Sequence, residues 1–433
     1  MTRSYPLIRL ALLALCAFSW VIVAAPTAAS ETAVETTILP SGLTVVSRQR
    51  PGTETASVAV AVRAGGRDEP DSLRGGSHWL EHIHFLGTTR YPTPAALFGE
   101  ISAAGGDLNA RTGTETTTYF VTVPATKLPA AVAVLGEILT RSSFPEAEVE
   151  RERGVVQEEL RGGQRRTGLS IAVQTLAEQL IGTAAQDAGG SVESVEAISR
   201  ADLLRYRAQH YTARNIVAAV VSPAAHAEVV ALVARAFEML PSGQVRVRAP
   251  QPPAVEGVHL EGYTPFEPVI IAGQRIPGLD AADAAALQVM DAVLDVPGTR
   301  MEDALRDARA ATQGGTLINQ LSDTGTWMAF GIAPPSRADQ VLEVIRAQVR
   351  RLQTERTSDA EVQAATRFLA GRVLLGSERG AAQATQLASQ TALGVYQTEE
   401  HAAARILAVT ADDVQRVARR YLDPDLFSVL VQE

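Results

Sequence analysis

Two long passages of this sequence repeat the same order of patterns at a fixed spacing. The first passage starts at residues 119–124 and ends in an Ala-Glu-Val triplet at 147–149. The second starts at residues 327–334 and ends in the same triplet at 360–362. The triplets lie 360 − 147 = 213 positions apart. A period this long indicates two duplicated domains, because the units of a solenoid repeat every 20–50 residues or so.

The patterns within each passage combine strands with helices. Alternating apolar residues at 56–62 predict a strand, and the closing segments at 216–222 and 427–432 do the same. Longer stretches rich in alanine, leucine, valine and arginine predict amphipathic helices at 125–139, 170–182, 336–352 and 360–375. We therefore expect an α+β fold of two duplicated domains, each a mostly antiparallel sheet with helices packed on one face.

The segment His-Trp-Leu-Glu-His at residues 78–82 carries the chemistry. Residues four apart share one face of a helix, so His78 and His82 can direct two imidazoles at one point. At about 100° per residue, Glu81 lies close to that face, whereas His84 falls outside it. H-x-x-E-H is the inverted form of the zinc-peptidase helix. The alternative is a surface helix that carries these side chains without a metal.

A catalytic zinc site needs three protein ligands and an open position for water. The segment 145–160 predicts a helix, with a proline near its start and acids in its first turn. Counted from Val156, Glu159 and Glu152 fall in the apolar arc, and Glu158 falls on the solvent side. A carboxylate on an apolar face needs a partner such as zinc. We expect Glu159 to be the third ligand and Glu152 to orient a ligating histidine. The alternative for Glu152 is a surface acid paired with an arginine.

In these residues the chain resembles the inverzincin metallopeptidases of the pitrilysin and mitochondrial processing peptidase family, in particular its short two-domain members. The distance from His82 to Glu159, 159 − 82 = 77 positions, fits that family. The seven-residue offset between Glu152 and Glu159 fits the family's E-R-x-V-x-x-x-E pattern. Residues 75–88 resemble the family's zinc helix and its exit turn, and residues 105–120 resemble its substrate-binding edge strand.

The resemblance implies a zinc-dependent endopeptidase with one Zn²⁺ per chain, held by the two motif histidines and Glu159. Glu81 is then expected to take a proton from water as general base and to return it to the leaving amine. An extended peptide is expected to add to the edge strand beside Asn109 and Ala110, which favours unfolded or short peptides. The alternative for Asn109 is a turn residue that enters the strand.

One feature of that family is missing. Its members bring an arginine and, seven positions later, a tyrosine to the scissile carbonyl. Residues 299–306 resemble the arginine segment, so Arg306 is our candidate for substrate binding, but position 313 is glutamine. Loss of one oxyanion donor costs about 10²–10³ in rate. Some short members of the family work as heterodimers, so we expect this chain to be the zinc-bearing subunit. Its partner is expected to be a homologous chain with the Arg-Tyr pair, and a homodimer is the alternative.

The second half of the sequence has no comparable metal motif. No second H-x-x-E-H occurs, and the 213-residue offset places Arg372 opposite Glu159 and Ala365 opposite Glu152. One domain is therefore expected to be catalytic, and its twin to be structural or to face the substrate.

Local composition predicts a signal segment and the boundaries of the two domains. Arginines and an apolar run precede a small-residue stretch, which predicts a secretory signal at residues 1–30 and a periplasmic or secreted protein. An uncleaved membrane anchor is the alternative. Proline, glycine and arginine cluster near residue 250. We expect a zinc-binding catalytic domain at 31–243, a linker at 244–258 and a homologous domain without a metal site at 259–433.

Charge and composition exclude some classes of function. The net charge of −9 argues against nucleic acid as a partner. The single cysteine lies in the predicted signal, so the mature chain offers no thiol nucleophile or thiolate ligand. Two rival functions stay open: a non-catalytic scaffold or partner subunit of a processing-peptidase-like complex, and a zinc hydrolase acting on a non-peptide amide. The intact H-x-x-E-H motif argues against the first.

Overall fold

The computed structural model describes residues 33–163, 167–245, 247–248, 256–263, 267–296 and 300–432. The chain divides into two compact units, Met1–Ala33 and Val34–Glu433, and the elements below belong to the second. The predicted signal at 1–30 lies outside the described residues, and the predicted linker is described only in part. No helix in the described ranges combines the length and apolar character that a bilayer span requires.

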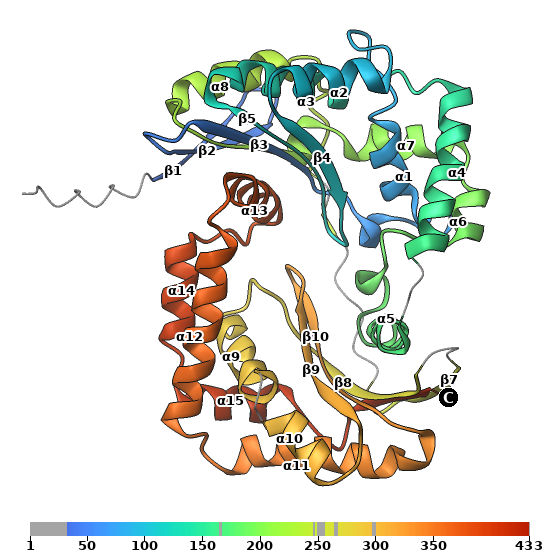
Figure 1. The fold of residues 1–433 in the computed structure, drawn as a ribbon, viewed down its shortest axis with the longest axis vertical. Coiled ribbons are helices and arrows are strands. Elements are labelled where there is room, and N and C mark those ends of the chain that lie inside the picture. Colours follow the sequence, from blue (N-terminus) through green and yellow to red (C-terminus); the bar gives the residue numbers. More distant parts are fainter. Residues whose placement is uncertain are drawn as a thin grey trace, which may run out of the picture. The chain divides into compact units, whose positions relative to one another are not determined.

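Two sheets organise the second unit (Figure 1). The first, in the order β1-β2-β6-β3-β5-β4, consists of β1 (Val34–Ile38), β2 (Thr44–Gln49), β3 (Thr55–Val62), β4 (Asp107–Thr112), β5 (Thr117–Pro124) and β6 (Ile216–Ser222). The second, in the order β7-β11-β8-β10-β9, consists of β7 (His259–Gly262), β8 (Val269–Pro277), β9 (Gln313–Gln320), β10 (Thr324–Ile332) and β11 (Ser428–Gln432). Among the described strands, β2 with β6 and β7 with β11 are the parallel pairs, so both sheets are mostly antiparallel, as predicted.

Each sheet carries a layer of helices from its own half on one face. The layer on the first sheet consists of α1 (Gly76–Ile83), α2 (Pro94–Ala103), α3 (Leu128–Arg141), α4 (Glu146–Gly163), α6 (Val192–Ala197), α7 (Arg200–His210) and α8 (His226–Ala236). The layer on the second sheet consists of α9 (Ala284–Asp295), α10 (Arg300–Asp307), α11 (Ala338–Thr354), α12 (Asp359–Gly376), α14 (Glu399–Leu407) and α15 (Ala411–Tyr421). The remaining helices are α5 (Gly168–Ile181) and α13 (Gly380–Leu393).

The two halves repeat one order of elements. From β3 to β6, and again from β8 to β11, a strand is followed by two α-helices, a pair of strands, five α-helices and a closing strand. In this order α4 corresponds to α12, and the edge strand β4 corresponds to β9. This repetition confirms the predicted α+β fold of two duplicated domains.

Strand β3 shows why both faces of the first sheet are apolar. Val58, Val60 and Val62 point into the core beneath the helix layer. Ala59 and Ala61 point to the opposite face, where they pack against α13. Because successive strand residues face opposite sides, the Val-Ala-Val-Ala run gives one face bulk and leaves the other flat enough for a helix to lie close.

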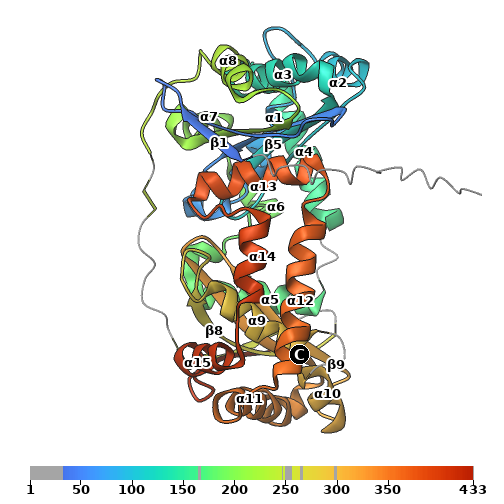
Figure 2. The ribbon, with the colours of Figure 1, turned by 90° about the vertical axis from the view of Figure 1, so that its left-hand side faces the viewer.

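That opposite face is covered, in each sheet, by one helix from the other half. Helix α13 packs on β3, β5 and β6 through Ala384, Leu387 and Ala388 (Figures 1 and 2). Helix α5 packs on β8, β10 and β11. At the start of α5, a Cβ on Gly168 would overlap the carbonyl oxygen of Glu267, so the close approach requires glycine. The sequence predicted α5, within the helix expected at 170–182, but neither α13 nor this exchange.

Polar contacts also join the halves at the turn between β4 and β5. The carboxylate of Glu115 accepts hydrogen bonds from Nη1 of Arg67 (2.6 Å) and Nη1 of Arg248 (2.8 Å). It also accepts from the backbone N–H (2.8 Å) and the hydroxyl (2.7 Å) of Ser322, in the turn between β9 and β10. Arg67 further pairs with Asp323 in that turn, at 2.9 Å. The tip of the hairpin that contains β4 is therefore anchored to the other half.

Candidate metal centre

Helix α1 carries the H-x-x-E-H motif, and its first turn is fixed from outside the helix. The carboxylate of Glu69 accepts the backbone N–H groups of Gly75 (2.8 Å) and Ser77 (2.6 Å). Burial raises the pKa of Glu69 to about 7, against the lowering effect of these hydrogen bonds. Gly75 precedes the helix at φ = +90°, and a Cβ there would lie 2.6 Å from the carbonyl oxygen of Gly189. Both observations require glycine at this position.

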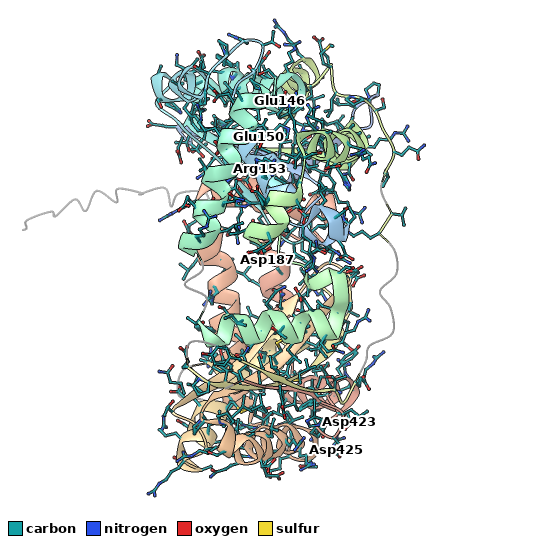
Figure 3. All side chains as sticks on the ribbon, turned by 90° about the vertical axis from the view of Figure 1, so that its right-hand side faces the viewer. Glu146, Glu150, Arg153, Asp187, Asp423 and Asp425 are labelled. Atoms are coloured by element: carbon teal, nitrogen blue, oxygen red, sulfur yellow. The ribbon has the colours of Figure 1, made fainter. Side chains whose placement is uncertain are left out.

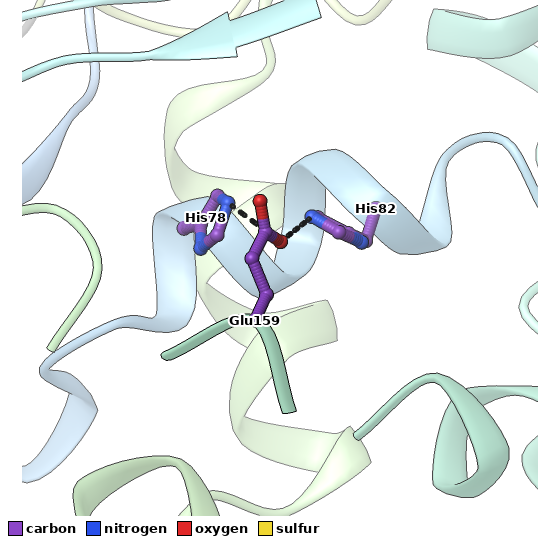
Figure 4. Close-up of side chains that lie close together, drawn as sticks. All are labelled: His78, His82 and Glu159. Carbon is purple, nitrogen blue, oxygen red and sulfur yellow. Dashed lines mark ion pairs between the residues drawn. The ribbon is translucent and has the colours of Figure 1, made fainter. Parts of the chain in front are cut away.

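The three predicted ligands come together at one point. The rings of His78 and His82 have centroids 4.8 Å apart, and both face the carboxylate of Glu159 on α4 (Figure 4). Oε2 of Glu159 lies 3.8 Å from Nε2 of His78 and 3.3 Å from Nε2 of His82. One ligand atom from each residue lies within 4.8 Å of the others. Two imidazole nitrogens and a carboxylate oxygen are a common donor set for catalytic zinc, so the residues present fit the ion.

Helix α4, which carries Glu159, also carries Arg153 (Figure 3), and this side chain fixes α4 against α1. The guanidinium of Arg153 lies 4.3 Å from the ring centroid of Trp79 in α1, a cation–π contact. Its Nη1 also donates to the carbonyl oxygens of Val195 (2.6 Å) and Ile198 (2.9 Å), at the end of α6. One side chain therefore links the two helices that carry the ligands.

Glu152 lies beside His82, with Oε1 3.0 Å from Nδ1 of the imidazole. No arginine in the described ranges pairs with Glu152, and the structure therefore places it where the sequence expected a carboxylate that orients a histidine. Burial opposes the charged form of His82, but the hydrogen bond to Glu152 and the neighbouring carboxylates outweigh it and raise the pKa. Burial, followed by the charge of His82, lowers the pKa of His78, which favours the neutral imidazole that can bind a metal.

Glu81 faces the same site from α1. Its side chain is 8 % exposed, and it accepts a hydrogen bond from the hydroxyl of Thr112 on β4. Burial raises the pKa of Glu81, although the hydrogen bond from Thr112 and the charge of His82 act in the other direction. A carboxyl group with a raised pKa suits proton transfer near neutral pH.

An open cavity of about 520 Å³ lies over these side chains. Its walls are apolar side chains and the edge strand β4, namely Phe85, Leu86, Pro94, Phe98 and residues 109–112. Two larger cavities, of about 680 and 600 Å³, lie elsewhere. Within the described residues, neither contains the ligand set of His78, His82 and Glu159. The smaller cavity is therefore the candidate site.

The predicted substrate residues separate into two groups. Asn109 and Ala110 lie on β4 beside the cavity, and Oδ1 of Asn109 accepts the backbone N–H of Ala110 at 2.8 Å. Arg306 lies on α10, is mostly exposed, pairs with Asp303 and does not line the cavity. Gln313 is the first residue of β9. The substrate role assigned to Arg306 stays a prediction.

Sequence reasoning left some residues of the site unassigned. Thr112 lies in a polar stretch without helical phase, so nothing pointed to its contact with Glu81. Arg153 lies in the E-R-x-V-x-x-x-E pattern, and that pattern was the available signal. His84, which the helix phase excluded as a ligand, is fully buried. Its Nδ1 lies 2.7 Å from the carbonyl oxygen of Leu80.

Comparison with family models covers most of both halves. Residues 44–187 match the model described as insulinase (peptidase family M16), and residues 197–369 match the model described as peptidase M16 inactive domain. The first match contains the three predicted ligands, and the second extends to α12.

Relatives of similar length give the same picture. The chain is 30 % identical over 406 residues to a Streptomyces coelicolor protein named as an uncharacterized zinc protease, covering 90 % of this chain and 87 % of that one. It is 31 % identical over 423 residues to the probable mitochondrial-processing peptidase subunit beta of Arabidopsis thaliana, covering 92 % and 78 %. A protein of Mycobacterium leprae, also named as an uncharacterized zinc protease, is 29 % identical over 411 residues, covering 92 % and 91 %.

Solved structures share the fold. A protease from Helicobacter pylori superposes with a TM-score of 0.82 at 20 % identity, covering 93 % of this chain and all of that one. A peptidase M16 inactive domain from Pseudomonas fluorescens gives a TM-score of 0.81 at 17 % identity, covering 92 % and 98 %. At these identities the likeness shows the fold alone.

Proposed function

The chain belongs to peptidase family M16, and on this basis we propose that it is a zinc-dependent endopeptidase that cleaves unfolded or short peptides. The observation that carries the proposal is the convergence of His78, His82 and Glu159 beside a cavity that also holds Glu81. A non-catalytic scaffold is the second candidate, and the intact set of four side chains opposes it.

The chemistry divides between a bound ion and the chain. His78, His82 and Glu159 would hold a zinc ion, which when bound would polarise the scissile carbonyl and lower the pKa of a water. Glu81 takes a proton from the attacking water as the water oxygen bonds to the carbonyl carbon. It then delivers that proton to the amine nitrogen as the C–N bond breaks. Thr112 holds the carboxylate of Glu81 in place through its hydroxyl.

The substrate binds in an extended conformation. Strand β4 ends its sheet, so its outer backbone groups can pair with a peptide that adds as a further strand. Asn109 and Ala110 contribute this edge next to the cavity. Main-chain pairing requires a peptide free of its own secondary structure, which is why unfolded or short peptides are the expected substrates.

The chain acts as the zinc-bearing subunit of a two-chain peptidase. Gln313 stands where a tyrosine is expected, and Arg306 lies outside the cavity. A relative is named as a beta subunit of the mitochondrial-processing peptidase, which supports a role beside a homologous chain. That partner supplies the Arg-Tyr pair, and a homodimer is the alternative. The basic and apolar pattern of residues 1–30 supports export to the periplasm or medium.

The decisive experiment measures zinc and peptide cleavage together. Wild type and Glu159→Gln are compared with Glu158→Gln, a matched change at an exposed neighbour that pairs with Arg161. Zinc content is expected to fall well below one ion per chain only in Glu159→Gln. Glu81→Gln is expected to keep its zinc and to lose peptide cleavage, measured with and without a candidate partner chain.

Three results would count against the proposal. If Glu81→Gln cleaved peptides as fast as wild type, the proton transfer assigned to it would be wrong. If wild type bound no zinc, or cleaved no peptide in the presence of every homologous partner chain from its own genome, the scaffold would become the preferred function.

A further inference from the structure

The outer edge of β4 presents two rows of side chains to an added peptide strand. Leu108 belongs to the core beneath the helix layer, and Thr112 donates to a carboxylate on α1, so these residues face α1. Successive strand residues point to opposite sides, which places Arg111 on the α13 side of the sheet. The register agrees, because the neighbouring Asn109 pairs with Phe120, which packs in the cluster around α13.

Arg111 stands out in this second row. It is exposed and lines the rim of the metal cavity, where it is the one arginine or lysine among the described lining residues. Its guanidinium makes no ion pair, hydrogen bond or ring contact with another described residue. By contrast, Arg67 and Arg248 both pair with Glu115, in the turn of the same hairpin. Arg111 is therefore a cation at the substrate edge that no group of the described chain neutralises.

The position of Arg111 relates it to the reacting bond. It directly precedes Thr112, whose hydroxyl contacts the carboxylate of Glu81. In an antiparallel addition to β4, the peptide residue paired with Arg111 has its Cβ about 4.5–5.5 Å from that of Arg111, within reach of the guanidinium. That residue lies next to the cleaved bond or about one residue from it, and its side chain points to the α13 side.

We propose that Arg111 selects peptides that carry an aspartate or glutamate at the position paired with it, beside the cleaved bond. The inference rests on the proposed peptidase function and adds a substrate class to it, peptides with an acidic residue at the cleavage site. Opposite charges on directly paired strand residues attract, and like charges repel by a similar amount. A lysine or arginine at that peptide position is accordingly disfavoured.

The test uses sets of unstructured peptides that differ only in one residue, aspartate, asparagine or lysine, placed in turn at each position around the cleaved bond. At one position, wild type is expected to favour aspartate over lysine in kcat/KM by about three- to tenfold at low salt. Added salt should reduce this ratio, because the contact is exposed. Arg111→Lys is expected to keep the preference, and Arg111→Glu to reverse it.

The control is Arg235→Glu, which changes the net charge equally at an exposed residue of α8. It should leave the aspartate-to-lysine ratio as in wild type. A ratio that is unchanged in Arg111→Glu, or a wild type without charge preference at any position, would overturn the proposal.

Binding separates this inference from the proposed function. The same labelled peptides are titrated into zinc-loaded Glu81→Gln protein and its Arg111→Glu derivative, and affinity is read by fluorescence anisotropy. A charge preference that reverses in binding supports the role of Arg111, even if wild type fails to cleave the peptides. Cleavage without any charge preference leaves the peptidase function intact and rejects the role of Arg111.

Discussion

The contact between His82 and Glu152 shows how one residue outside the ligand set controls it. A carboxylate at 3.0 Å from Nδ1 fixes which nitrogen carries the proton and leaves Nε2 to the metal. We predict that Glu152→Ala lowers zinc affinity by about 10–100-fold, because the ring loses its orientation. Competition with a chelator measures the zinc affinity of each variant. Glu146→Ala, an exposed change at the start of the same helix, should leave affinity unchanged. Equal affinities in both variants would contradict the assigned role.

Asp291, in the second half of the chain, gives a second prediction for a single residue. It is buried in α9 and accepts a hydrogen bond from Nε1 of Trp327 at 3.0 Å. Burial raises its pKa from 3.8 to about 7. Between these values the folded state binds more protons than the unfolded state, so its contribution to stability falls as pH rises through this window.

The variant Asp291→Asn removes that titration. Relative to it, wild type is expected to lose up to about 1.4 kcal/mol of unfolding free energy per pH unit between about pH 4 and pH 7. Thermal unfolding of both proteins at several pH values measures the difference. A difference that stays constant with pH would show that Asp291 is already ionised in the folded protein.

At the scale of elements, the packing of α4 on α1 depends on Arg153. Replacement by alanine removes the stack on Trp79 and the hydrogen bonds to two carbonyl oxygens at the end of α6. We predict a loss of about 1–3 kcal/mol in stability and weaker zinc binding, because Glu159 shifts with its helix. Arg151→Ala, at an exposed position of α4, is the control and should change neither quantity appreciably. Denaturant unfolding and a zinc titration report the two effects.

A substitution at the start of α5 tests whether this helix packs closely on the sheet of the other half. Gly168→Ala forces a methyl group into the carbonyl oxygen of Glu267, so we predict destabilisation by about 1–3 kcal/mol. In α12, a Cβ at Gly371 meets nothing within 4 Å, and Gly371→Ala should stabilise the protein by about 0.5–1 kcal/mol. Melting temperatures measured by calorimetry show whether each substitution stabilises or destabilises the protein. Stabilisation by both substitutions would contradict the close approach of α5 to Glu267.

How far the sequence could predict the site depends on the kind of information involved. Helix phase depends on neighbours in the chain, so it could separate Glu159 from Glu158 and exclude His84. The meeting of α1 with α4 depends on packing between segments 77 positions apart in sequence. It was expected because a carboxylate on an apolar face needs a partner, and the spacing of the family that the chain resembles supported it. The contact of Thr112 with Glu81 depends on the register of β4, which no local pattern specified.

For the fold too, local patterns could be predicted from the sequence and long-range packing could not. The 213-residue repeat and the strand and helix patterns led to two duplicated α+β domains. They did not predict that α5 and α13 each lie on the sheet of the other half. Both helices have enough apolar residues to pack on either sheet. Which sheet they cover depends on contacts between distant segments, which no local pattern specifies.

At the scale of the whole molecule, the exchanged helices make the halves depend on each other. We predict that a protease site inserted near residue 252 can be cut without separating the fragments. The first fragment keeps α5 on the second sheet, and the second keeps α13 on the first. The ion pair of Arg48 with Glu399, at 2.7 Å, adds to this hold. Size-exclusion chromatography of the cut protein measures it, with uncut protein as control. Fragments that elute apart in native buffer would contradict the prediction.

The exchange of helices also explains why the first half cannot stand without the second. Loss of the second half would strip α13 from the first sheet and leave Val46, Ala59 and Ala61 in water. The half that carries the three ligands therefore depends on the second half for its covering helix. Arg372 and Ala365 stand where Glu159 and Glu152 stand in the first half, so the second half lacks these two carboxylates but still supplies the helix that covers the first sheet.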